Sequence, residues 1–184
     1  VMAPEDAGTS FAERYGIVAR SCTVTRRMSL RSRSDLLDIR VLGPLEVHVD
    51  GDPLRVDTRK ATAILALLAV ERRPYARDEL AAMLWPESDD EAARGALRRT
   101  LSVLRTALGD GWLRVDRSTV ALAAHGGGVW VDLAALEAGA SAGDPSSLAE
   151  AAALARGPFL AGFSLRDSPD FDDWRATRAV TVER

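Results

Sequence analysis

Hydrophobic and polar residues alternate along residues 38–56, which is the pattern of β-strands with one buried face. Two turn signals, Gly43-Pro44 and Asp50-Gly51-Asp52, divide this run into short pieces. The pattern therefore predicts a small antiparallel sheet of three strands. The alternating apolar positions are Ile39, Val41, Leu45, Val47 and Val49.

In the next segment the apolar positions recur every three or four residues, which predicts helices. The first helix covers TRKATAILALLAVERR, with Asp57 or Thr58 as its N-cap and Pro74 as its end. The second helix covers RDELAAMLW and stops at Pro86. The positions expected to face the core are Ala61, Ile64, Leu65, Leu68, Leu80, Met83 and Leu84.

A third helix follows, and after it a hairpin. Ser88 and Glu91 have the spacing of a capping box, and Gly109 is a typical helix end. The run WLRVDRSTVALAA contains two short alternating stretches around Asp116-Arg117-Ser118, which is a hairpin pattern. A sheet, three helices and a hairpin, in this order, predict an α+β fold: a winged helix with an N-terminal antiparallel sheet and a C-terminal hairpin wing.

The chain divides into three predicted parts. Residues 1–35 show no periodicity and are rich in Ser, Thr and Arg, which predicts a flexible basic extension. Met28 is an alternative start, which would make the residues before it an upstream artefact. Residues 36–125 form the winged helix. Residues 130–184 begin an all-α domain: helical segments run from VWVDLAALEAG through Ala155, and after a Pro/Gly turn the chain ends inside a helical pattern, as a fragment of a longer protein would.

Composition excludes several classes of protein. Hydrophobic residues make up 47% and charged residues 28%, which are ordinary values for a globular protein. One cysteine and two histidines offer neither a disulfide nor a zinc site, and no apolar run is long enough to cross a bilayer. There is no phosphate-binding loop and no nucleophile pattern near His48 or His125. We therefore expect a cytoplasmic protein that is not an enzyme, has no cofactor and does not bind a membrane.

The third helix carries an unusual distribution of charge. The formal net charge of the chain is −3, but residues 92–109 contain four arginines and no acidic residue. On a helical wheel one face is leucine, and the opposite face is arginine with small hydroxyl residues. Arg94 and Arg98 are like charges four residues apart, which disfavours a helix unless an anion neutralises them. Gly95, on the same face, would let a phosphate backbone come close. A solvated amphipathic helix remains the alternative to a nucleic-acid interface.

Two stretches, VLGPLEVHVDGDPLRV and ELAAMLWPESDDEAARGALRRTLSVLRTALG, resemble the DNA-binding domain of the Streptomyces antibiotic regulatory protein (SARP) family. More broadly, they are similar to bacterial regulators that join an OmpR-type winged helix to a bacterial transcriptional activator domain. The match covers residues 38 to about 125. The segment from GPFLAGF to the end of the chain is similar to the first helices of the activator domain, which are tetratricopeptide-like.

The resemblance implies that the third helix enters the major groove of DNA and that the hairpin is a wing over the minor groove. Arg59 and Lys60, at the start of the first helix, are further candidates for contact with backbone phosphate; a solvated helix N-terminus is the alternative. Family members have a second basic residue where Val103 stands and an aromatic pattern in the wing that this chain lacks, so we expect fewer contacts there. The candidate DNA-binding residues on the third helix and the wing are Arg94, Arg98, Arg99, Ser102, Arg105, Arg114 and Arg117.

The same resemblance implies partners. They are double-stranded promoter DNA, RNA polymerase, and a second copy of the chain on direct-repeat sites, so the protein would be a transcriptional activator. An alternative is a protein-interaction module whose arginine face binds an acidic partner or the acidic C-terminal segment of the same chain. The acidic cluster Asp167, Asp170, Asp172 and Asp173 lacks the spacing of a calcium loop and reads as a solvated helix start. In a third hypothesis, this acidic segment covers the arginine face until a signal releases it.

Overall fold

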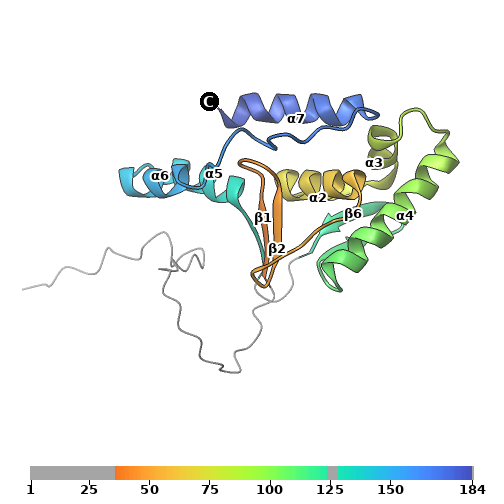
Figure 1. The fold of residues 1–184 in the computed structure, drawn as a ribbon, viewed down its shortest axis with the longest axis horizontal. Helices are drawn as coiled ribbons and strands as arrows, with labels where there is room; N and C mark the ends of the chain where they lie inside the picture. The colour runs from red at the N-terminus through yellow and green to blue at the C-terminus, as the bar shows by residue number, and fades with distance from the viewer. Residues whose placement is uncertain (1–35, 124–127, 184) are drawn as a thin grey trace, which may run out of the picture.

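The computed structural model describes residues 36–123 and 128–183. The predicted basic extension, residues 1–35, lies outside these ranges, and so does most of the connection between the hairpin and the C-terminal segment. Within the described residues the chain forms two small sheets and a set of helices around one hydrophobic core (Figure 1). The prediction of an α+β winged helix followed by helices is confirmed.

The first sheet contains the three predicted strands and one more. β1 (Leu36–Arg40), β2 (Glu46–Val49) and β3 (Asp52–Pro53) pair antiparallel, as the alternation predicted. β7 (Gly128–Val131) joins the other edge of β1 in parallel, so the strand order is β3-β2-β1-β7. The expectation that the chain is helical from Val129 onward was wrong for these residues, because a four-residue apolar strand becomes recognisable only beside its distant partner.

The three helices of the winged helix have the predicted order and nearly the predicted bounds. They are α2 (Arg59–Glu71), α3 (Arg77–Leu84) and α4 (Asp90–Leu108). Thr58 caps α2, since its hydroxyl accepts a hydrogen bond from the backbone N–H of Ala61 at 3.2 Å. The N-cap of α4 is Asp89, whose carboxylate accepts from the N–H of Ala92 at 2.8 Å, so the prediction of Ser88 as cap was wrong by one residue.

The second sheet contains the predicted hairpin, β5 (Leu113–Val115) and β6 (Thr119–Leu122). The strand β4 (Tyr75–Ala76), which was not predicted, pairs with β6 and gives the order β4-β6-β5. β4 lies between α2 and α3, so the hairpin is attached to the helices by a strand as well as by side chains. Trp112, which directly precedes β5, is buried in the core and supports the base of the hairpin.

The C-terminal segment packs on the winged helix. α5 (Asp132–Ala142) and α6 (Pro145–Ala152) lie against each other, and α7 (Pro169–Val182) runs alongside α2 (Figure 1). The carboxylate of Asp132, which is 1% exposed, accepts hydrogen bonds from the backbone N–H groups of Val41 at 2.8 Å and Leu42 at 2.9 Å. Residues on both sides of the predicted boundary near residue 130 thus share a core, and the division into two domains stays a prediction.

Glu71 connects the end of α2 to α7. One of its carboxylate oxygens accepts hydrogen bonds from Trp174 Nε1 at 2.8 Å and from Arg178 Nε at 2.7 Å. Burial alone would raise the pKa of Glu71, but these two hydrogen bonds and the charge of Arg178 outweigh it and hold the pKa below its ordinary value. A depressed carboxylate pKa means that the charged form stabilises the folded state.

We predict that Glu71→Gln lowers the free energy of unfolding by about 1–2 kcal/mol, because it removes two charge-assisted hydrogen bonds. Urea denaturation of the whole chain measures this loss. The difference in unfolding free energy between the variant and wild type should reach its full size above the ordinary pKa of glutamate. It should vanish as the pH falls through the depressed pKa of Glu71. Glu137→Gln, which removes the carboxylate of the exposed Arg72–Glu137 pair, is the control. An equal loss of unfolding free energy in both variants would show that the hydrogen bonds from Glu71 to α7 contribute no more to stability than an exposed ion pair does.

Candidate nucleic-acid interface

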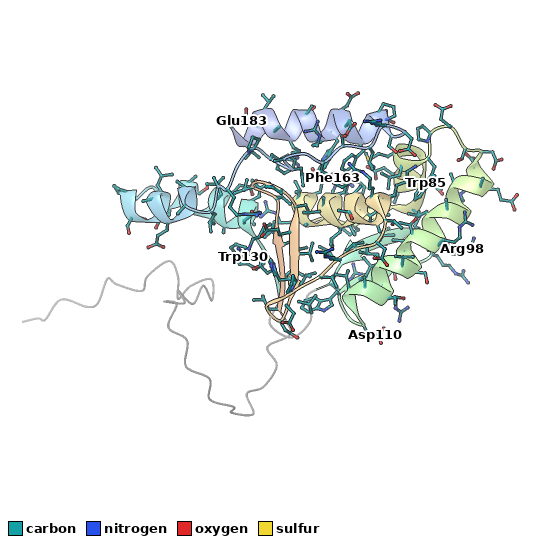
Figure 2. The ribbon with its side chains drawn as sticks, viewed as in Figure 1. Trp85, Arg98, Asp110, Trp130, Phe163 and Glu183 are labelled. Atoms are coloured by element: carbon teal, nitrogen blue, oxygen red, sulfur yellow. The ribbon has the colours of Figure 1, made fainter. Side chains whose placement is uncertain are left out.

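The candidate interface is the solvent-facing side of α4. One side of this helix is buried against the rest of the winged helix, while Arg94, Arg98, Arg99 and Arg105 are exposed. Figure 2 shows Arg98 pointing from α4 away from the body of the protein. The division into two faces was predicted from sequence and is confirmed; the role of the arginine face stays a prediction. The buried residues of α4 are Ala93, Leu97, Leu101, Leu104 and Leu108.

The four arginines of this face differ in their partners. Arg94 forms an ion pair with Asp78 of α3 at 2.8 Å, and Arg105 forms one with Asp110 at 3.2 Å. Both pairs are exposed to solvent, so each contributes little and exchanges readily for another anion. Within the part of the chain that the structure describes, Arg98 and Arg99 have no acidic partner. These two guanidinium groups are therefore available to a ligand without losing an existing bond.

The two other candidate arginines lie on the hairpin. Arg114, in β5, is 3.8 Å from the carboxylate of Asp116, and Arg117 is exposed in the turn between β5 and β6. A residue that sequence reasoning missed holds this turn in place: the backbone N–H of Arg77 donates to the carbonyl of Ser118 at 2.8 Å, and its guanidinium donates to the carbonyl of Asp116 at 3.2 Å. No local pattern signals this role, because the partners of Arg77 are about 40 residues away.

Arg59 and Lys60 do not lie on the arginine face of α4. Arg59 donates to the carbonyl of Ser164 at 2.6 Å, and its guanidinium lies 5.1 Å from the ring centre of Phe163. Lys60 donates to the carbonyl of Leu84, pairs with Asp167 at 2.8 Å, and lies over the ring of Trp85. Both residues thus hold the loop before α7 against the winged helix. A contact of either residue with DNA stays a prediction.

The acidic cluster at the start of α7 does not touch the arginine face. Asp167 is paired with Lys60, and Asp172 accepts from the backbone N–H of Leu165 at 3.1 Å. Asp170 and Asp172 lie in the first turn of α7, where the helix dipole favours negative charge. Among the described residues, no ion pair joins an acid of this cluster to an arginine of α4. No contact in this arrangement supports the hypothesis that the segment covers the arginine face.

Comparison with known proteins gives one set of relatives. No family model matches the chain. The transcriptional regulatory protein EmbR, from Mycobacterium bovis and from two strains of Mycobacterium tuberculosis, is 38% identical over 93 residues. The match covers 50% of this chain but only 22% of each relative, so the chain spans about a fifth of their length.

A solved structure extends the likeness to the C-terminal segment. It is that of Mycobacterium tuberculosis EmbR in complex with a low affinity phosphopeptide, with a TM-score of 0.58 and 27% sequence identity. The match covers 80% of this chain and 43% of that one. The chain is thus similar to a mycobacterial transcriptional regulator in both sequence and fold. Among the described residues, no helix has the length and apolar character needed to cross a membrane.

Gly95 leaves open space on the arginine face. A Cβ at this position would meet only the end of the Arg99 side chain, at 3.6 Å, which is an ordinary contact. Gly139 of α5 is different, because a Cβ there would lie 2.5 Å from Cβ of Ala151. The two helical glycines therefore have different roles. Gly95 leaves the surface of α4 open, and Gly139 allows α5 and α6 to pack closely.

We predict that Gly95→Ala raises the free energy of unfolding by about 0.5–1 kcal/mol, because alanine is the better helix former and meets no obstruction. Gly139→Ala should instead lower it, because α5 and α6 must move apart. Thermal denaturation of both variants beside wild type tests the pair. A destabilised Gly95→Ala variant would mean that the space around Gly95 is not open.

Proposed function

We propose that this chain is the DNA-binding part of a transcriptional regulator of the SARP family, with an OmpR-type winged helix that binds double-stranded promoter DNA. The observation that carries the proposal is the exposed face of α4, on which four arginines occur without an acidic residue of the same helix between Ala92 and Leu108. An ordinary solvated helix mixes both signs of charge, which stabilises it. A helix face that carries only positive charge is favoured when a binding partner supplies negative charge.

The dimensions of the elements fit duplex DNA. α4 has 19 residues, so it is about 28 Å long, and the major groove of B-DNA is about 12 Å wide and admits one helix. Arginine suits both tasks in such a groove: its planar fork grips O6 and N7 of guanine or clamps a phosphate. In this proposal Arg94, Arg98, Arg99, Ser102 and Arg105 contact the major groove and its phosphates.

The hairpin β5–β6 is the proposed wing at the neighbouring minor groove, with Arg114 and Arg117 as its contacts. Its attachment through β4 and Arg77 supports this role, because a wing must keep a fixed position relative to the reading helix to add to specificity. The turn holds one arginine and the strand the other, so we expect the wing to contribute fewer contacts than α4.

The rest of the proposed function follows from the resemblance. The protein would act in the cytoplasm as an activator, contact RNA polymerase and bind direct repeats as side-by-side copies, without being an enzyme. The similarity to EmbR, which is named a transcriptional regulatory protein, supports regulation of transcription.

A second candidate function is a protein-interaction module. The EmbR structure contains a phosphopeptide, and exposed arginines without acidic partners also suit phosphorylated or acidic peptides. In that case the same face of α4 would bind protein in place of DNA. The two functions differ in their salt dependence and in their ligands, so one titration separates them.

We expect the chain to bind mixed duplex DNA with a log affinity that falls by about 4 to 6 for each tenfold rise in salt concentration. The variant Arg98→Gln/Arg105→Gln should make the slope less steep by about 1.8, because each phosphate contact contributes about 0.9. Fluorescence anisotropy with a labelled duplex, titrated at several salt concentrations, measures both quantities.

The control is Arg40→Gln/Arg72→Gln, which removes the same charge at two arginines whose ion-pair partners, Asp38 of β1 and Glu137 of α5, lie outside α4. This variant should keep the wild-type slope. A folded wild-type chain that fails to bind duplex at low salt, but binds an acidic or phosphorylated peptide, would establish the interaction module instead. Equal effects of the two double variants would mean that net charge, and not α4, determines the binding.

We further predict that Gly95→Ala weakens DNA binding although it stabilises the protein, because the added methyl group occupies the space that the DNA backbone needs. The same anisotropy titration measures this effect. An affinity equal to that of wild type would place the DNA backbone away from Gly95.

A further inference from the structure

Beside the arginine face lies a cleft of about 840 Å³ that the sequence did not suggest. It is formed by the first turn of α2, Trp85 at the end of α3, the flank of α4 and the loop 162–167 before α7. The loop belongs to the C-terminal segment, so this cleft exists only because that segment packs on the winged helix. The polar side chains that line it include those of Thr58, Arg59, Lys60, Arg99, Thr100 and Arg166.

Positive charge dominates the cleft. Among its described lining residues there are four cations and one carboxylate, that of Asp167. This carboxylate is already paired with Lys60 at 2.8 Å, and the hydrogen bond from Lys60 holds the pKa of Asp167 below its ordinary value. Arg99 and Arg166 are exposed and have no acidic partner in the described part of the chain. Cations gathered in this way repel one another unless an anion lies between them.

The loop that carries Arg166 is firmly held. The residue before it, Leu165, is 3% exposed, and its backbone N–H donates to Asp172. Two residues after it, the hydroxyl of Ser168 donates to the carbonyl of Leu84, at the end of α3, at 2.9 Å. Arg166 therefore extends from a fixed backbone position. A ligand that binds this side chain therefore orders the side chain alone and does not have to order the loop.

We propose that this cleft holds a phosphate of the DNA backbone beside the groove that α4 occupies, and that Arg166 is a DNA contact supplied by the C-terminal segment. The inference rests on the proposed function. The occupant follows from continuity: Arg99 belongs both to the exposed face of α4 and to the lining of the cleft, so a duplex lying on that face brings its backbone to the cleft. The C-terminal segment then strengthens DNA binding and does not mask it.

The test compares Arg166→Gln, Arg166→Lys and wild type in anisotropy titrations with duplex DNA across salt. Arg166→Gln should make the slope less steep by about 0.9 and lower affinity at 0.1 M salt about five- to tenfold, equally for all duplex sequences. Arg166→Lys, which keeps the charge, should stay close to wild type in slope. Arg40→Gln, which removes a half-buried arginine of β1 that is paired with Asp38, is the charge control and should leave slope and affinity unchanged.

The outcomes separate the two proposals. If Arg98→Gln/Arg105→Gln flattens the slope but Arg166→Gln behaves as Arg40→Gln does, the cleft proposal is overturned and the proposed function stands. If the folded wild-type chain binds no duplex at low salt, both fail. Arg166 is exposed, so its variants should fold, and circular dichroism verifies this.

A second measurement distinguishes the DNA backbone from a free anion. Inorganic phosphate is added to wild type and to Arg166→Gln at constant ionic strength, and the melting temperature is measured. Phosphate that stabilises wild type but not Arg166→Gln, together with an unchanged duplex slope for Arg166→Gln, would make the cleft a site for a free anion and overturn the proposal. A changed duplex slope supports the backbone contact, whatever the response to phosphate.

Discussion

α2 has almost no surface left for solvent. Nine of its 13 residues are buried, and they lie on every side of the helix, so one apolar neighbour is not enough to cover it. α4 and β6 pack against it, and residues of the first sheet and of the C-terminal segment belong to the same hydrophobic core, which explains why residues far apart in the chain share that core. Charge appears only where the helix leaves this core: Lys60 at its start binds the loop before α7, and Glu71 at its end binds α7 itself. The position of α4 depends on this packing.

Sequence patterns predicted those elements whose signal is local. The three helices and the hairpin β5–β6 have apolar positions at a clear period, and their bounds agree to within a few residues. The strands β4 and β7 were missed, because two to four residues are too few to show a period and their identity depends on pairing with β6 and β1. The cap of α4 was misplaced by one residue because Ser88 and Asp89 are both good caps, and only the backbone geometry decides between them.

In the candidate interface too, local features were predictable from sequence and long-range contacts were not. The arginine face of α4 was predictable, since a helical period and the absence of acids both lie within one short stretch. Arg77 and Arg166 were not singled out, because what gives each a role is a neighbour from a distant part of the chain. Arg59 and Lys60 were chosen for their charge alone, and their contacts with the loop before α7 depend on tertiary packing that no local pattern contains.

The parallel pairing of β7 with β1 has a consequence for the order of folding. The backbone N–H of Val41 donates to the carboxylate of Asp132, 91 residues later, so the edge of β1 stays open until the whole winged helix has left the ribosome. Contacts of such long sequence separation form late, because the loop between them must first be ordered. During that interval the open edge of β1 can pair with another chain, which makes this edge the point where a nascent or shortened protein would aggregate first.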